Sequence, residues 1–154
     1  MFIFSIFAFW RGRELSRVLD QSHPDTIWMH SVVRYIGFWG ISAVNQYSKK
    51  NPEVRIFLSH HDVGWIAPFP QDVTDEGMIP ISPRFSDFVR MTQGFSRLTA
   101  SLKWLYIQLY RKVLPTRLTH ILFSPFLEQH IQRHFPQDKI IIFPHSYDEG
   151  TFHP

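Results

Sequence analysis

The residues best suited to chemistry stand where a short apolar run stops. Residues 54–58 are β-branched or apolar apart from one arginine, and they lead into Ser59, His60, His61 and Asp62. The glycine and the two prolines that follow exclude a regular continuation of the strand. An apolar strand that ends in ionisable groups is typical of the carboxyl edge of a parallel sheet, where ligands bind. Turns also need polar residues, so the same pattern has a purely structural interpretation.

A second strand end carries similar side chains. Residues 25–31 read Asp-Thr-Ile-Trp-Met-His-Ser and predict a strand that runs into His30 and Ser31. Apolar residues at helical spacing over 32–50 predict a helix between this strand and residues 54–58. Strand, helix and strand form a βαβ unit, whose two strands are parallel neighbours. Both strands then end at one edge, so we expect the two polar clusters to lie side by side.

Two more strands complete the predicted domain. Residues 119–123 and 139–143 are apolar runs of strand length. Between them, Ser124 can cap a helix over 125–135, whose first residue is a proline. The pattern predicts an α/β fold: a Rossmann-like parallel sheet with helices on both faces, in a single domain over residues 1–154.

A long amphipathic helix, or two, is predicted over residues 84–113. Its apolar residues recur at intervals of four, three, four, three and four: Met91, Phe95, Leu98, Leu102, Leu105 and Leu109. We expect this face to pack on the sheet. The helix is also basic and carries Trp104, Tyr106 and Tyr110, a combination that also suits a helix on an anionic membrane surface. Peripheral membrane contact is therefore a second interpretation.

The amino-terminal segment is predicted to be a buried helix. Residues 1–10 are almost wholly apolar, but a membrane span needs about 20 such residues. A signal peptide would carry its positive charges before the apolar run, whereas here the arginines follow it. The helix is expected to continue to Leu19, with Leu15, Val18 and Leu19 on its inner side.

Composition narrows the chemistry further. The formal charge of +3 and the pI near 9.4 suit anionic partners in general, and the absence of cysteine excludes thiolate chemistry. The basic residues are dispersed and no nucleic-acid-binding motif is present, so nucleic acid is not an expected partner. His130 and His134, four residues apart on a helix, could bind a metal from one face. No carboxylate joins them in a His-Glu-x-x-His pattern, and we assign no metal site.

The motifs, in this order, resemble the amino-terminal half of GT-B glycosyltransferases. They are a strand reading Asp-x-Ile-x-x-His-Ser, a strand ending in His-Asp, a helix begun by Ser, and Pro-His-x-x-Asp-x-x-x-Phe-x-Pro over residues 144–154. The best match is the retaining family 4 of nucleotide-sugar-dependent enzymes, from about Asp25 onward. In that family the last motif usually begins Pro-Asn-Gly-Val-Asp and marks the passage between two domains. Here His145 and Ser146 replace the usual Asn-Gly.

The resemblance implies roles for individual residues. His61 matches the cleft histidine that contacts the transferred sugar or the acceptor, and Asp62 matches its partner, so these two are the catalytic candidates. A neutral imidazole can both donate to and accept from sugar hydroxyls. The substrate-binding candidates lie in or beside the matched motifs: His30, Ser31, His60, Ser124, His145 and Asp148.

The same resemblance implies the partners. They are a nucleotide-sugar donor and a glycan or lipid-linked acceptor, with no cofactor, in the cytoplasm or at the membrane surface. The family's Gly-rich loop would precede Met1, and its carboxyl-terminal domain with the Glu-x(7)-Glu motif would follow residues 144–154, the start of an interdomain linker. We therefore expect an acceptor-binding part that is inactive alone and needs that domain or a partner chain. The alternative is a non-catalytic α/β module that binds a partner chain or a glycan.

Overall fold

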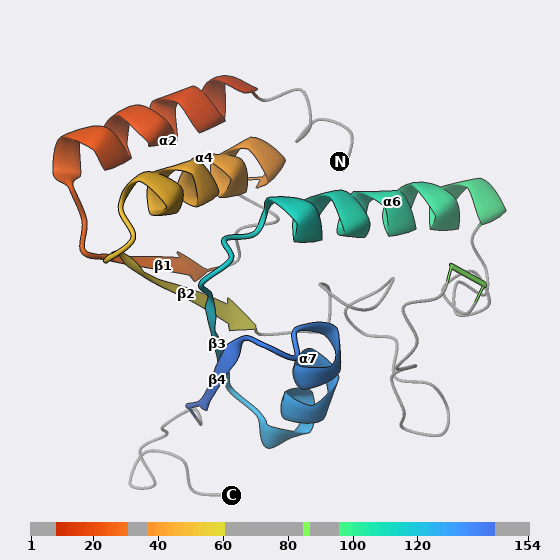
Figure 1. Ribbon diagram of the computed structural model, residues 1–154. Helices are drawn as coiled ribbons and strands as arrows, with labels where there is room; N and C mark the ends of the chain where they lie inside the picture. Colours follow the sequence, from red (N-terminus) through yellow and green to blue (C-terminus); the bar gives the residue numbers. More distant parts are fainter. Residues whose placement is uncertain (1–8, 31–36, 61–84, 87–95, 144–154) are drawn as a thin grey trace, which may run out of the picture.

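The predicted parallel sheet is present. The computed structural model describes residues 9–30, 37–60, 85–86 and 96–143. Within these residues the strands are β1 (Thr26–His30), β2 (Arg55–His60), β3 (Thr119–Leu122) and β4 (Lys139–Ile142). They lie in the order β1-β2-β3-β4, and every neighbouring pair is parallel (Figure 1). The predicted strands, the βαβ unit and the Rossmann-like α/β class are thereby confirmed.

Helix α2 (Phe9–Ser22) precedes the first strand, and the other helices lie in the crossovers between successive strands. These crossover helices are α4 (Gly37–Lys50), α6 (Arg97–Val113), the short 3-10 helix η1 (Pro125–Leu127) and α7 (Glu128–His134). Right-handed crossovers between strands taken in spatial order carry their helices to the same face of the sheet. Helices α4, α6 and α7 therefore cover one face of the sheet, as expected for that face. Among the helices described, none is long and apolar enough to cross a membrane.

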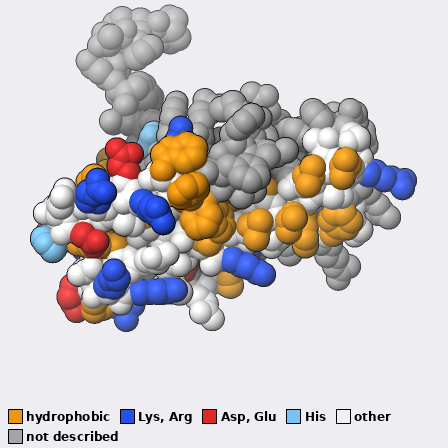
Figure 2. Space-filling view, turned by 90° about the horizontal axis from the view of Figure 1, so that it is seen from above, with side chains coloured by type: hydrophobic (Ala, Val, Ile, Leu, Met, Phe, Trp, Pro, Cys, Tyr) orange, Lys and Arg blue, Asp and Glu red, His pale blue; other side chains and the backbone are white. Residues whose placement is uncertain are grey.

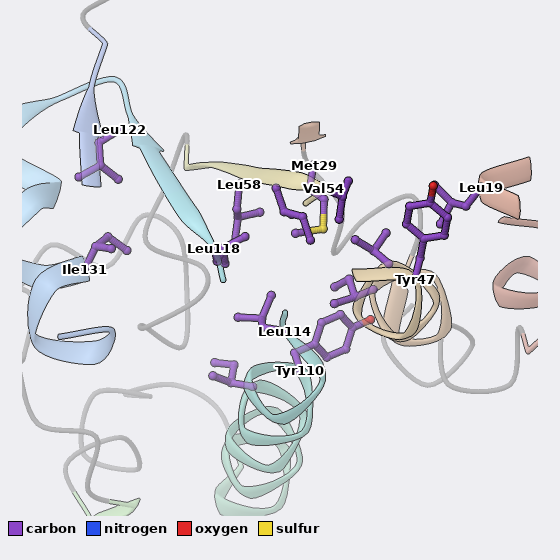
Figure 3. Packing of buried hydrophobic residues seen from close by; sticks show 14 of the residues in the cluster. Leu19, Met29, Tyr47, Val54, Leu58, Tyr110, Leu114, Leu118, Leu122 and Ile131 are labelled. Carbon is purple, nitrogen blue, oxygen red and sulfur yellow. The ribbon is translucent and has the colours of Figure 1, made fainter. Parts of the chain in front are cut away.

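One hydrophobic core joins the sheet to these helices. Strand side chains alternate between the two faces, so every second residue of each strand points into the core. Leu58 of β2 and Leu122 of β3 are fully buried there. Figure 3 shows the strand residues facing side chains from three helices: Tyr47 of α4, Tyr110 of α6 and Ile131 of α7. Removing these apolar groups from water is the main force that holds the layers together.

Helix α2 packs on α4 through a close backbone contact (Figure 1). Gly12 lies at this contact, and a Cβ atom at its position would come within 2.8 Å of the carbonyl oxygen of Trp39. Such a distance is too short for any side chain, so only glycine allows this approach. Helix α4 in turn begins at Gly37, whose φ of 70° favours glycine.

Fewer side chains of α2 are buried than the sequence predicts. Leu19 is buried and Leu15 packs against the core, as expected. Val18, however, is 51% exposed, and Phe9 and Trp10 are exposed as well. The predicted burial of these three side chains is wrong, because α2 touches the rest of the described chain mainly along one stripe, on α4.

The largest correction concerns α6. Four leucines predicted to pack on the sheet are instead among the exposed large hydrophobic side chains: Leu98, Leu102, Leu105 and Leu109. We call these residues the leucine stripe. The buried face of α6 carries a different set: Ala100, Tyr106, Ile107, Tyr110 and Leu114. Met91 and Phe95, predicted on the same face as the leucines, lie outside the described residues.

Aromatic packing explains which face of α6 is buried. The Tyr106 and Tyr110 rings lie with their centroids 4.2 Å apart, and Tyr110 meets Phe38 of α4 at 6.0 Å. Aromatic side chains bury a large surface, and ring-to-ring contacts such as these add to the gain from burial. The face with the tyrosines therefore turns inward, and the leucine stripe remains outside.

Candidate functional site

The carboxyl ends of β1 and β2 bring a histidine and a serine into contact. His30 is the last residue of β1 and lies opposite Ser59 of β2 in the strand register. The Nδ1 atom of His30 is 3.0 Å from the Ser59 hydroxyl, which donates to the carbonyl oxygen of Met29 at 3.3 Å. Because the hydroxyl has one proton, His30 Nδ1–H is the donor to Ser59. In the neutral tautomer that carries its proton on Nδ1, the Nε2 atom of an imidazole is an acceptor.

The next residue of β2, His60, belongs to a buried relay on the other face of the sheet. Its Nε2 atom is 2.7 Å from Nδ1 of His120 in β3, and Nε2 of His120 is 2.9 Å from Oδ2 of Asp138. His60 and His120 are 1% and 0% exposed, respectively, whereas Asp138 reaches the surface in part. The two imidazole planes are inclined by only 25°, which suits a hydrogen bond between ring nitrogens. We call His60, His120 and Asp138 the histidine relay.

The relay determines where the protons lie. A carboxylate only accepts, so His120 donates Nε2–H to Asp138. Burial lowers the pKa of His120, and this outweighs the opposing hydrogen bond and charge of Asp138, so the ring is neutral at neutral pH. A neutral His120 then accepts at Nδ1 the Nε2–H of His60. The carboxylate of Asp138, just before β4, thus sets the tautomer of His60 at the end of β2.

Another buried histidine, His134, lies on α7 next to a cation. The Arg111 side chain donates to the carbonyl oxygen of His134 at 2.9 Å, and its guanidinium lies 3.4 Å from the ring nitrogen Nδ1. Burial, the charge of Arg111 and the neighbouring His130 lower the pKa of His134 to about 4. A guanidinium beside the ring opposes a bound metal cation at the His130–His134 pair. In the part of the chain that the structure describes, no three His, Asp or Glu side chains are grouped to hold a metal ion.

The predicted site residues fall into three groups. His30 and His60 end neighbouring strands at the same edge, but strand alternation sends their side chains to opposite faces. Ser124 follows β3 at this edge, where its hydroxyl accepts from the Phe126 backbone N–H at 3.3 Å and caps η1, as predicted. The remaining candidates lie outside the described residues: Ser31, His61, Asp62, His145 and Asp148.

Sequence reasoning missed three residues of these polar arrangements. Ser59 was seen as part of the strand end, but its bond to His30 follows only from the register of β1 and β2. His120 is separated from His60 by 60 positions, and Asp138 from His120 by 18. The one available signal was the polar residue inside the apolar run of β3, because a buried histidine needs hydrogen-bond partners.

At this edge the exposed imidazole of His30 bonds to the buried hydroxyl of Ser59, and the buried His60 lies on the opposite face of the sheet. An exposed imidazole can hydrogen-bond to the hydroxyl groups of a neutral ligand. The carboxyl edge is also where ligands bind in open parallel sheets. No family model matches this chain, and comparisons with curated proteins and with solved structures find no match.

Proposed function

We propose that the chain is the acceptor-binding, Rossmann-like part of a retaining glycosyltransferase of the GT-B type. The observation that carries the proposal is the His30–Ser59 hydrogen bond at the carboxyl edge of the sheet. It lies where the resemblance expects the acceptor to bind, and it directly precedes the stretches that hold Ser31, His61 and Asp62. The parallel topology, which the family shares, supports the same proposal.

Sugar binding is the chemistry that this edge suits. A sugar hydroxyl can donate to His30 Nε2, while the Ser59 bond keeps the imidazole ring in one orientation. His61 and Asp62 are proposed to contact the transferred sugar or the acceptor. The donor is proposed to be a nucleotide sugar, and the acceptor a glycan or lipid-linked sugar. Because nucleotide sugars are cytosolic, the proposed activity places the protein in the cytoplasm.

Binding to saccharides is the first test. The imidazole resonances of His30 are followed by NMR while neutral mono- and oligosaccharides and soluble lipid-phosphate sugars are added. We expect at least one ligand to shift the His30 signals, and His30→Ala to weaken its binding by about tenfold, as loss of one buried hydrogen bond does. The control is His23→Asn, which removes an exposed histidine at the other end of β1. Its φ of 45° is one that asparagine tolerates.

The second test separates an enzyme part from a glycan-binding module. Transfer needs groups that stabilise a departing nucleotide diphosphate, and in the family these belong to the Gly-rich loop and the carboxyl-terminal domain. With those parts supplied, His61→Ala should lower turnover at least about a hundredfold while leaving the thermal unfolding temperature unchanged. Saccharide binding without any transfer would favour the non-catalytic module. No shift of His30 with any saccharide would overturn the proposal as a whole.

A further inference from the structure

Helix α6 is apolar on two opposite sides, but the described chain covers only one of them. The leucine stripe is 69%, 52%, 49% and 36% exposed at Leu98, Leu102, Leu105 and Leu109, respectively. Spacings of four, three and four residues place these side chains in one line along the helix. Figure 2 shows this line as a row of hydrophobic side chains along α6. An exposed apolar row of this length marks a surface that binds something.

The apolar surface continues beyond α6. In Figure 2 hydrophobic side chains extend from α6 to the amino-terminal ends of α2 and α4. Those ends carry three exposed aromatic side chains: Phe9, Trp10 and Trp39. Tryptophan is enriched where proteins meet the boundary between lipid headgroups and acyl chains, because its ring is apolar and its N–H is polar.

Positive charges predominate beside this surface, and the start of α2 also carries the exposed Glu14. The sequence of α6 contains arginine and lysine but neither aspartate nor glutamate. Arg97 at its start and Lys112 in its last turn are both exposed, at the two ends of the leucine stripe. At the start of α2, Arg13 is exposed and its guanidinium lies 5.5 Å from the centre of the Phe9 ring. An occupant of this surface must therefore combine negative charge with an apolar layer.

We propose that α6 docks the protein onto the surface of an anionic lipid bilayer. The leucine stripe enters the boundary between headgroups and acyl chains, and Arg97 and Lys112 contact lipid phosphates. The buried face of α6 stays on the protein core, so the helix lies along the membrane surface. A second copy of the chain suits the stripe less well, because two copies of α6 would bring like charges together with no acidic residue on either helix.

Flotation with lipid vesicles tests the proposal. The whole chain is mixed at low salt with vesicles of phosphatidylcholine alone, or of phosphatidylcholine with phosphatidylglycerol. We expect binding to the anionic vesicles only, and a loss of at least about tenfold in the double variant Leu102→Glu, Leu105→Glu. The matched control, Gln21→Glu with Gln46→Glu, adds the same charge at exposed positions outside the stripe and should bind nearly as wild type does.

A second variant protects the test against misfolding. Arg97→Gln with Lys112→Gln changes only exposed side chains, and it should weaken anionic binding without lowering the unfolding temperature. Raising the salt concentration should have the same effect on the wild type. Unchanged vesicle binding by the Leu102→Glu, Leu105→Glu protein would overturn the proposal, as would the absence of binding at low salt. A dimer in ultracentrifugation that the same two substitutions dissociate would instead assign the stripe to a second copy.

Discussion

Ser59 and His60 are neighbours in the chain but belong to two different polar arrangements. Ser59 bonds to the exposed His30, whereas His60 bonds to the fully buried His120. The cause is strand alternation, which sends consecutive side chains to opposite faces of the sheet. The His30 ring of the first arrangement is open to solvent, whereas both imidazole rings of the histidine relay are buried. The two arrangements should therefore respond very differently to substitution.

The largest effect is expected for His120→Ala. This change leaves a cavity and removes the hydrogen-bond partners of both His60 and Asp138. It should lower the free energy of unfolding by about 3 kcal/mol, since buried polar groups are costly to leave without partners. Urea unfolding at neutral pH measures it. A loss below about 1 kcal/mol would mean that the relay does not stabilise the fold.

The second-largest effect on stability is expected from acid, through the buried histidines. Folding lowers the pKa of His134 from 6.5 to about 4. It also lowers the pKa of His120. Between these pKa values the unfolded chain binds the proton and the folded chain does not, so falling pH favours unfolding. From about pH 7 to about pH 5, His134 alone should lower the free energy of unfolding by about 2 kcal/mol.

The control for this pH dependence is His134→Gln, which removes the titrating group. The variant should show a clearly smaller loss between the same two pH values in urea unfolding. An equal loss in the variant and the wild type would assign the acid sensitivity to other groups.

A smaller effect is expected for Asp138→Ala, because Asp138 is partly exposed and water can replace its carboxylate. Stability should fall by about 1 kcal/mol. The specific readout is the proton position: long-range proton–nitrogen NMR should find His120 and His60 protonated at Nε2 in the wild type and a tautomer mixture in the variant. Unchanged tautomers in Asp138→Ala would show that the carboxylate does not set them.

The smallest effect on stability is expected at the exposed His30. His30→Ala should change the free energy of unfolding by no more than about 0.5 kcal/mol, since the ring is exposed. The same substitution is the one expected to weaken saccharide binding. If His30→Ala destabilised the protein as much as His120→Ala, the distinction between the two arrangements would be lost.

Local sequence signals were sufficient for the strands. Each strand is a short apolar run bounded by polar or turn-forming residues, and the observed bounds differ from the predicted ones by two residues or fewer. The buried face of α4 was also predictable: Ile41, Val44 and Tyr47 recur at helical spacing and are all buried. That helix has one dominant apolar face, so its pattern has a single interpretation.

For α6, the spacing of apolar residues predicted the wrong buried face. Leu98, Leu102, Leu105 and Leu109 repeat as regularly as the residues of any core face, and the opposite side, with Tyr106 and Tyr110, is apolar as well. Periodicity measures the regularity of a pattern but not which of two apolar faces meets the core. Which face of α6 is buried depends on a residue of another helix, Phe38 of α4, whose ring contacts the Tyr110 ring.

The sequence by itself determined the βαβ order, the parallel sheet class and the positions at which polar residues end the strands. These features depend on residue type and spacing within a few neighbouring positions. Tertiary structure alone decided which side of α6 is buried, that His60 turns away from His30, and that Asp138 reaches His120. The physical reason is that these contacts join segments far apart in the chain. Strand register and competition between side chains for the core bring the segments together. No local sequence pattern encodes either of these.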